Sequence, residues 1–414
     1  MRLRIRKKYL FYILAFSSSI IAAIGSGIDT ITDTLINDPL VLGLSCFLIG
    51  IIISFLFTLL FSIPIGKKSL GARTIDPSFK RIRLLKRQEV GLHLLAGLGN
   101  AILTLGYFSL LSRIGDPSIV LPFSQVVILY LVIFESITEK NIPTLVEIQS
   151  SVIVTFGAIL GSISLSGSLN LESLLIVFCV INPGWVLLSL AQRKLKTMKI
   201  NDRPNDAINI RLWNVIFACT FTAIILFLFD IMNNTNKVLE SVEASIHYFQ
   251  WVVLIAIATF FSFVFYIRAL GIGKASVTQA VRSSIIIFTI PVSLVLVYFG
   301  YIDPFSTDPV LLLIKIIGII LMLLGIVSFA LTLTKAYIFI TMKTGYPIEE
   351  TMEKLWKIRG VTRVTATAGH YDFIVKIRTR TLVKGYENIV RKVGEIKGIK
   401  NYRWESVLKE WENI

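Results

Sequence analysis

The predicted fold depends on two similar stretches of sequence, YFSLLSRIGDPSIV at residues 107–120 and FYIRALGIGKASVT at residues 265–278. Each begins with a pair of aromatic residues at the end of an apolar segment, passes through a tight turn with glycine, and enters the next apolar segment. The turn at 272–278 follows the turn at 114–120 by 158 residues. A feature that recurs at such an interval predicts an internal repeat.

Apolar segments long enough to cross a bilayer surround both turns. Of the 414 residues, 54% are hydrophobic and 16% are charged, whereas a soluble domain carries about 25% charged residues. A helix needs roughly 20 mainly apolar residues to cross the hydrocarbon core, where lipid offers no partners for open backbone groups. We therefore expect ten membrane helices, at residues 9–29, 39–63, 89–111, 116–137, 146–166, 171–193, 207–231, 249–271, 275–300 and 308–333.

The basic residues predict the orientation of these helices. Lysine and arginine are concentrated before the first segment and in the loops near 64–88 and 193–203, while the loops at 30–38, 164–170 and 301–307 carry neither. Basic loops remain in the cytoplasm, so we expect a multi-pass protein of the cell membrane with both termini cytoplasmic. The net charge of +16 then reflects orientation and proximity to anionic lipid, and we expect no nucleic-acid partner.

Ten segments with five in each half place the two turns on opposite sides of the membrane. The halves, about 9–166 and 171–333, would therefore be inverted relative to one another. Inverted repeats are typical of secondary transporters, which bind their substrate near the midplane between the halves.

On these features the region 9–333 resembles the EamA-type members of the drug/metabolite transporter superfamily. The residues that carry the resemblance are YIRALGIGKAS at 266–276 and GIILMLLG at 318–325. The resemblance implies a transporter domain over 1–334, with ten spans in two five-helix repeats. Glu135 or Glu139 would be the acidic residue that the family has after its fourth helix. Small residues also let membrane helices pack closely, which is our preferred interpretation of the late-span glycines Gly157, Gly161, Gly318 and Gly325.

Arg282 is the polar residue of the ninth segment that most needs an explanation. An arginine near a helix centre costs roughly 2.5–3.5 kcal/mol on insertion scales, so it usually faces a cavity or a partner. With Gln279 and Ser283 beside it, Arg282 could bind a carboxylate or another anionic group of a substrate. The alternative is that its long side chain reaches back to the cytoplasmic surface, and both interpretations stay open.

Other candidates lie where segments are interrupted or end. Asn182-Pro183-Gly184-Trp185 predicts a kink in the sixth segment, so Asn182 and Trp185 are candidates for the cavity. Asp29 and Asp33 close the first segment and either couple transport to an ion or mark a helix end at the outer mouth. Weaker candidates for the cavity are Trp213, Asn214, Asn100 and Gln125.

From Lys335 onward the sequence pattern is that of a small soluble domain. Strands are expected at 336–342, 361–368, 371–378 and 402–408, and amphipathic helices at 347–358 and 382–397. This order, βαββαβ, predicts a ferredoxin-like α+β sandwich.

The tail, residues 335–414, resembles the ligand-sensing domain of Lrp/AsnC-type regulators. Gly369-His370-Tyr371-Asp372 stands where that family has its Gly-x-x-Asp turn, and 398–400 (GIK) also fits. The resemblance implies a cytoplasmic domain that pairs through its sheet into a homodimer and binds a small effector near Gly369, Tyr371 and Asp372. The alternative is that Gly369 and Asp372 only shape the turn.

Together these features predict a secondary transporter of a small metabolite, such as an amino acid or a related compound, regulated by an effector on the tail. No catalytic nucleophile, metal-ligand cluster or phosphate-binding GxxxxGK[ST] loop occurs, so we expect neither an enzyme nor a bound cofactor. The rival hypothesis is a membrane-anchored sensor of small molecules without transport activity. Uptake into proteoliposomes distinguishes the two.

Overall fold

The computed structural model describes residues 7–115, 117–138, 145–161, 172, 175–200, 203–302, 308–331, 334–358, 360–379 and 389–406. The chain divides into two compact units, Met1–Ala330 and Leu331–Ile414.

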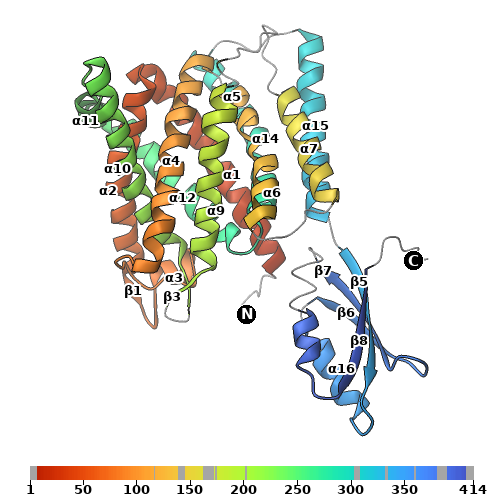
Figure 1. Ribbon diagram of the computed structural model, residues 1–414. Helices are drawn as coiled ribbons and strands as arrows, with labels where there is room; N and C mark the ends of the chain where they lie inside the picture. Colours follow the sequence, from red (N-terminus) through yellow and green to blue (C-terminus); the bar gives the residue numbers. More distant parts are fainter. Residues whose placement is uncertain are drawn as a thin grey trace. The chain divides into compact units, whose positions relative to one another are not determined.

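The first unit is a bundle of helices, with one or two helices at the position of each of the ten apolar segments (Figure 1). These helices are α1 (Lys7–Ile36), α2 (Pro39–Ser62), α4 (Arg87–Ile114), α5 (Pro117–Ser124), α6 (Val127–Thr138), α7 (Leu145–Gly161), η1 (Ile176–Ile181), α9 (Asn182–Thr197), α10 (Ala207–Asn233), α12 (Phe249–Leu270), α13 (Ala275–Arg282), α14 (Ile285–Tyr298) and α15 (Pro309–Leu331). Within the described residues, seven spans are long and apolar enough to cross a membrane: α1, α2, α4, η1 with α9, α10, α12, and α13 with α14. This composition indicates a multi-pass membrane protein.

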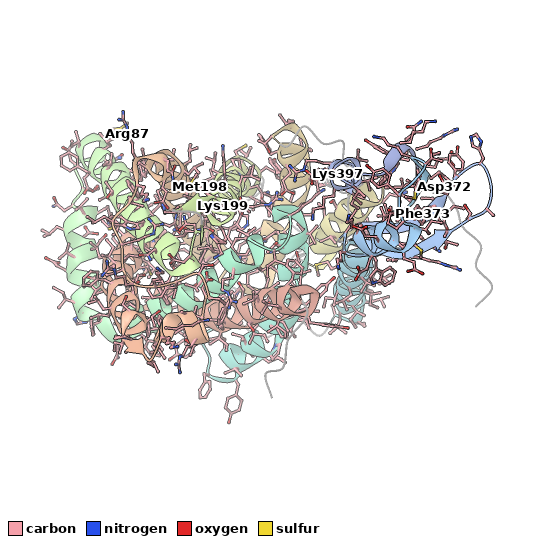
Figure 2. All side chains as sticks on the ribbon, turned by 90° about the horizontal axis from the view of Figure 1, so that it is seen from below. Arg87, Met198, Lys199, Asp372, Phe373 and Lys397 are labelled. Atoms are coloured by element: carbon pink, nitrogen blue, oxygen red, sulfur yellow. The ribbon has the colours of Figure 1, made fainter. Side chains whose placement is uncertain are left out.

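The loops rich in basic residues gather at one end of the bundle. The first contains β1 (Pro64–Ile65), β2 (Lys68–Ser69) and α3 (Leu70–Thr74), and the second contains β3 (Lys199–Ile200) and β4 (Arg203–Pro204). Both hairpins lie at the lower end in Figure 1, and the view from below in Figure 2 shows Arg87, Met198 and Lys199 there. We call this the basic end of the bundle.

At the opposite end of the bundle lies a short helix that the sequence pattern did not predict, α11 (Lys237–His247) (Figure 1). Its Ser241 carbonyl accepts a hydrogen bond of 2.8 Å from Ser45 of α2. Leu239, Val242 and Ile246, which are exposed, share one face of the helix. An apolar face of this kind suits a helix that lies along the membrane surface.

Two helices of the bundle are interrupted after eight residues each. A turn at Gln125 and Val126 separates α5 from α6, and a turn at Ser283 and Ser284 separates α13 from α14. The two interruptions are again 158 residues apart in the chain. They also touch, because the Ser283 hydroxyl donates a hydrogen bond of 2.9 Å to the Gln125 side-chain oxygen.

Glycines allow pairs of helices to cross at close distance. A Cβ atom on Gly99 of α4 would lie 2.6 Å from the carbonyl oxygen of Gly184 of α9. A Cβ atom on Gly157 of α7 would lie 2.7 Å from the carbonyl oxygen of Gly318 of α15. Gly325 packs in the same way against Val154. These contacts support helix packing as the role of Gly157, Gly318 and Gly325.

The sixth apolar segment, in which a kink is expected, continues through Pro183 as a helix whose hydrogen-bonding pattern changes just before the proline. The π-helix η1 leads into α9, and the Asn182 N–H donates to the carbonyl of Val177, five residues back. Because proline has no N–H to donate, a wider turn just before it keeps the segment helical.

The second unit contains β5 (Thr334–Met342), α16 (Ile348–Trp356), β6 (Val361–Ala366), β7 (Phe373–Thr379) and β8 (Ile399–Ser406). The antiparallel sheet has the order β6-β7-β5-β8, which is the strand order of a ferredoxin-like sandwich. Alternate residues of β5 face the core, and Ile338 lies opposite Val375 of β7 and Trp404 of β8. Residues 389–394 are helical, whereas residues 382–388 of the expected second helix lie outside the described residues.

Candidate functional site: a cavity at two helix interruptions

A cavity of about 160 Å³ lies inside the first unit, between α1, α2, α4, α5, α9, α10, α12, α13 and α14. An apolar protein cavity of about 150 Å³ accommodates benzene, so this one has room for a small organic molecule. Its walls are mostly apolar. The polar side chains that line it are Ser26, Asp29, Cys46, Asn100, Thr104, Tyr107, Ser124, Gln125, Trp185, Arg211, Thr259, Ser262, Gln279 and Arg282.

In α1 and α2 the lining residues lie from the middle of the bundle toward the end that carries α11. Those of α1 fall in its second half, between Ile21 and Asp29, and α1 begins at the basic end. Those of α2 fall in its first half, between Cys46 and Gly50, and α2 runs in the opposite direction. In α10, however, the lining residues Arg211 and Val215 lie within the first nine residues of the helix, which follows the β3–β4 hairpin, so the cavity also extends toward the basic end.

Arg282 ends α13 and forms part of the cavity wall at the interruption of that helix. Its side chain is 6% exposed, and its guanidinium carbon lies 4.7 Å from the ring centre of Trp185 and 5.0 Å from that of Tyr266. Its Nε donates a hydrogen bond of 3.3 Å to the Ser18 hydroxyl. Arg282 is thus held inside the bundle by aromatic faces, and its side chain does not reach the surface.

Gln279 of α13 links Trp185 and Gln125 in a chain of hydrogen bonds at the cavity wall. The Trp185 indole N–H donates to the Gln279 side-chain oxygen at 3.1 Å, and the Gln279 amide donates to the Gln125 oxygen at 3.0 Å. Ser283 does not line the cavity but holds the same Gln125 oxygen. Asn182 is buried outside the lining, and its side-chain amide has no hydrogen-bond partner among the described residues.

A second cavity arginine, Arg211 of α10, was not among the predicted candidates. It is 3% exposed, and its guanidinium carbon lies 4.5 Å from the ring centre of Phe263. Its one hydrogen bond to another described residue is a long contact of 3.4 Å to the Asn214 side-chain oxygen, which also accepts from Asn100. The signal was an arginine inside an apolar segment, the same feature that singled out Arg282.

Asp29 and Asp33 have different surroundings. Asp29 lines the cavity and accepts a hydrogen bond of 3.3 Å from the Tyr107 hydroxyl. Asp33 is buried one turn further along α1 and does not line the cavity. Asp29 lies eleven residues, or roughly 16 Å along an α-helix, from the Ser18 that holds Arg282. The acidic and cationic groups therefore lie toward different ends of the cavity.

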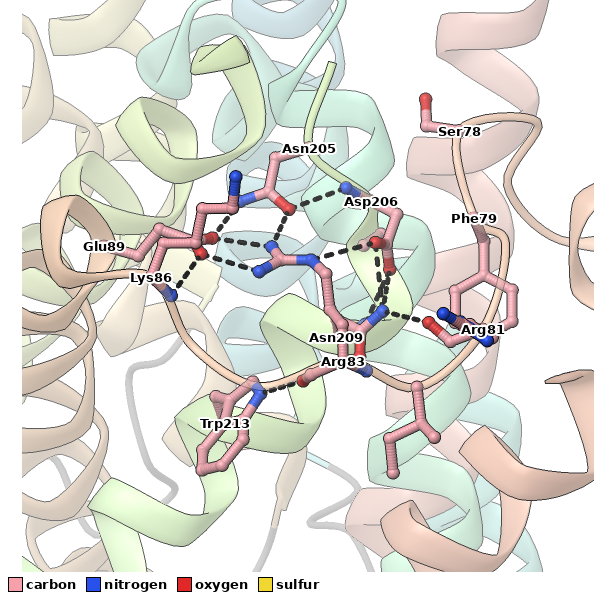
Figure 3. Close-up of polar contacts among 12 residues, drawn as sticks. Ser78, Phe79, Arg81, Arg83, Lys86, Glu89, Asn205, Asp206, Asn209 and Trp213 are labelled. Atoms are coloured by element: carbon pink, nitrogen blue, oxygen red, sulfur yellow. Dashed lines mark hydrogen bonds and ion pairs between the residues drawn. The ribbon is translucent and has the colours of Figure 1, made fainter. Parts of the chain in front are cut away.

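A polar network centred on Arg83 lies at the basic end of the bundle (Figure 3). The Arg83 guanidinium forms a bidentate pair with Glu89, at 2.6 and 2.7 Å, and also donates to Asn205 at 2.7 Å. Burial alone would lower the pKa of Arg83, but its hydrogen bonds to Glu89 and the charge of Asp206 raise it. Trp213, one of the weaker candidates, donates its indole N–H to the Arg83 carbonyl and does not line the cavity.

Two further ion pairs at the basic end join the first half of the bundle, before residue 166, to its second half, after residue 171. The Lys196 ammonium lies 2.6 Å from a carboxylate oxygen of Asp76, and both side chains are buried. Burial alone would raise the pKa of Asp76, but Lys196 and two backbone N–H groups hold the pKa below its usual value. Glu135 pairs with Arg193 and accepts the backbone N–H of Ala275 at the start of α13.

In the second unit, Gly369, Tyr371 and Asp372 lie in the connection between β6 and β7. The Asp372 carboxylate accepts the backbone N–H of Met342 at 2.6 Å and so fixes the end of β5. The Tyr371 ring packs 5.0 Å from Phe339. A Cβ atom on Gly369 would meet no heavy atom within 4 Å, so packing does not require glycine there. This geometry gives Asp372 a turn-shaping role and leaves effector binding a prediction.

Comparison with known proteins adds information for the tail. No curated protein matches the chain. A solved structure described only as "Crystal structure of protein" is 14% identical, with a TM-score of 0.47, and the match covers 77% of this chain and 95% of that one. Residues 335–413 match the family model of the Lrp/AsnC ligand binding domain. The second unit is therefore a C-terminal ligand-binding domain of the Lrp/AsnC family.

Proposed function

We propose that the chain is a secondary transporter of a small metabolite, such as an amino acid or a related compound, with an EamA-type membrane domain. In this proposal ten spans form two inverted repeats, 9–166 and 171–333, and both termini lie in the cytoplasm. Seven spans of suitable length and composition support it, as do helices at the positions of the other three.

The observation that carries the proposal is the meeting of two interrupted helices at the cavity. The α5–α6 and α13–α14 interruptions are 158 residues apart, and Gln125 and Ser283, which occupy equivalent positions in them, are hydrogen-bonded. Secondary transporters commonly build their substrate sites from discontinuous helices at the interface between two repeats. The central cavity is then the substrate site.

The ion pairs at the basic end give this transporter a closed inner side. Asp76–Lys196 and Glu135–Arg193 join the first proposed repeat to the second. Alternating access requires that such contacts break when the site opens to the cytoplasm.

Transport itself is tested with the full chain in proteoliposomes. We expect time-dependent uptake of at least one radiolabelled amino acid or related metabolite, absent from empty liposomes. Ala22 lines the cavity, so Ala22→Trp should block uptake by filling it. Val152, on the exposed face of α7, is the matched control, and Val152→Trp should leave uptake unchanged.

A membrane-anchored sensor is the second candidate function, favoured by the ligand-binding domain at residues 335–413. In either case we expect the tail to bind a small effector and to pair into a homodimer through its sheet. Calorimetry of the full chain with an amino-acid panel measures effector binding. Binding to the tail without uptake of any compound would favour the sensor.

A further inference from the structure

We infer that Arg211 and Arg282 form an anion-binding end of the central cavity, which takes a small organic anion through its carboxylate or another acidic group. That this anion is also the transported substrate rests on the proposed function, whereas the binding site does not.

The two arginines come from different helices to the same aromatic ring. The guanidinium carbon of Arg211 lies 4.5 Å from the centre of the Phe263 ring, and that of Arg282 lies 5.7 Å from it. Both side chains line the cavity and are at least 94% buried. Taking each of these two charges out of water has a cost, which an anion bound near both guanidinium groups would offset.

Neither guanidinium has a carboxylate partner among the described residues. Arg282 bonds the Ser18 hydroxyl, and Arg211 makes its long contact to Asn214. Asp29, the carboxylate that lines the cavity, accepts a hydrogen bond from Tyr107 toward the other end of the cavity. Charged residues within membrane helices are normally paired with one another or serve a ligand, and the first explanation does not apply to this pair.

Arg211, which lines the cavity, has an unused hydrogen-bond donor. Its Nε is buried with no hydrogen-bond partner among the described residues. A guanidinium donates only, so it selects a ligand that accepts. Carboxylates and phosphates are the acceptors that guanidinium groups bind most strongly.

The rest of the wall suits an organic body. Trp185 and Phe263 stand beside the arginines, and Ile181, Val215 and Ile255 add aliphatic surface to the lining. An inorganic anion would leave this apolar surface without contacts. The site therefore favours an organic acid of small size over free phosphate.

Thermal unfolding of the purified full chain tests the site without requiring transport. The probes are matched acids and amides: phenylacetate with phenylacetamide and succinate with succinamide, with orthophosphate as the inorganic anion. We expect at least one acid to raise the unfolding temperature while its amide and phosphate do not. Arg211→Gln and Arg282→Gln should each raise the apparent Kd of that acid at least tenfold, and lysine variants should recover part of the affinity.

Arg113→Gln is the control for these variants, because Arg113 pairs with Glu172 at 2.5 Å and lies outside the cavity. Its apparent Kd should equal that of the unmodified protein. If no acid stabilises the protein more than its amide does, or if neither cavity variant changes the Kd, the inference is wrong. Stabilisation by phosphate alone would overturn the assignment to an organic acid.

A second measurement needs no ligand at all. Replacing an unpaired buried charge by an apolar residue of similar length removes a cost, so Arg211→Met should raise the unfolding temperature in anion-poor buffer. Arg83→Met should lower it, because Arg83 is paired with Glu89. A similar fall in both variants would give Arg211 a structural role and contradict the inference.

The two proposals fail separately. Arginine-dependent binding of an acid in a protein that transports nothing would leave the site in place and remove the transporter. Uptake of a neutral compound by a protein that no acid stabilises more than its amide would leave the transporter and remove the anion site.

Discussion

Asp76 and Lys196 show, at the scale of single residues, what burial does to a charge. Each side chain is at least 92% shielded from solvent, and they lie 2.6 Å apart. Taking two charges out of water has a large cost that only good geometry offsets, so removing one partner is far worse than removing both.

Lys196→Met should therefore destabilise the protein by about 3–5 kcal/mol, because it leaves the Asp76 carboxylate buried without its partner. Asp76→Asn combined with Lys196→Met should recover much of this loss. Chemical unfolding of the single and double variants in detergent measures the coupling. A double variant no more stable than Lys196→Met would show that the two residues act independently.

The lowered pKa of Asp76 also predicts how stability depends on pH. A carboxyl whose folded-state pKa lies below its value of 3.8 in the unfolded chain stabilises the fold fully above about pH 4. That contribution is lost as the pH falls through the lowered pKa. Asp76→Asn should therefore show a flatter fall in unfolding temperature below pH 4 than the unmodified protein, as measured by a series of thermal scans.

One cavity residue, Arg211, was not predicted from the sequence. The rule that a charge inside an apolar segment needs an explanation singled out Arg282, and it applies equally to Arg211. Arg211 lies four residues inside α10, close to a basic loop, where an arginine resembles an ordinary flanking charge. Only the three-dimensional structure brings it to Phe263, beside Arg282.

Among the helices and strands, the hydropathy pattern located the seven helical spans that are long and apolar enough to cross a membrane and the sheet of the tail, and shorter helices lie at the other three expected positions. The interruptions at Gln125 and Ser283 were not predicted, because neither turn contains glycine or proline. Helix α11 was missed because its eleven residues are too short and too polar to resemble a span. The network around Arg83 joins segments more than 100 residues apart, which no local pattern reveals.

The close crossing of α4 and α9 predicts that a side chain on Gly99 destabilises the protein. Gly99→Ala places a methyl group 2.6 Å from a backbone oxygen of Gly184, so the two helices must separate, at a cost of about 1–3 kcal/mol. A Cβ atom on Gly91, on the same helix, would meet no heavy atom within 4 Å, which makes Gly91 the matched control. Gly91→Ala should be neutral or slightly stabilising, since alanine favours helix by about 0.5–1 kcal/mol over glycine. Equal effects in thermal scans would contradict close packing at the crossing.

At the scale of the whole molecule, the proposed orientation assigns each end of the bundle to one side of the membrane. In a background without Cys46, Cys179 and Cys219, Lys67→Cys in the basic end and Asn236→Cys beside α11 give two exposed reporters. A membrane-impermeant maleimide applied to intact cells should label Asn236→Cys and leave Lys67→Cys unlabelled until the cells are opened. The reverse pattern would invert the topology.

The hydrogen bond between Gln125 and Ser283 has a mechanical consequence. It joins equivalent positions of the two proposed repeats, so an axis of pseudosymmetry between them passes close to it. When two related halves rock to exchange inward and outward states, points near that axis move least. This hydrogen bond would therefore stay intact throughout the cycle and mark the pivot of the motion. The ion pairs at the basic end would break and form again in each cycle.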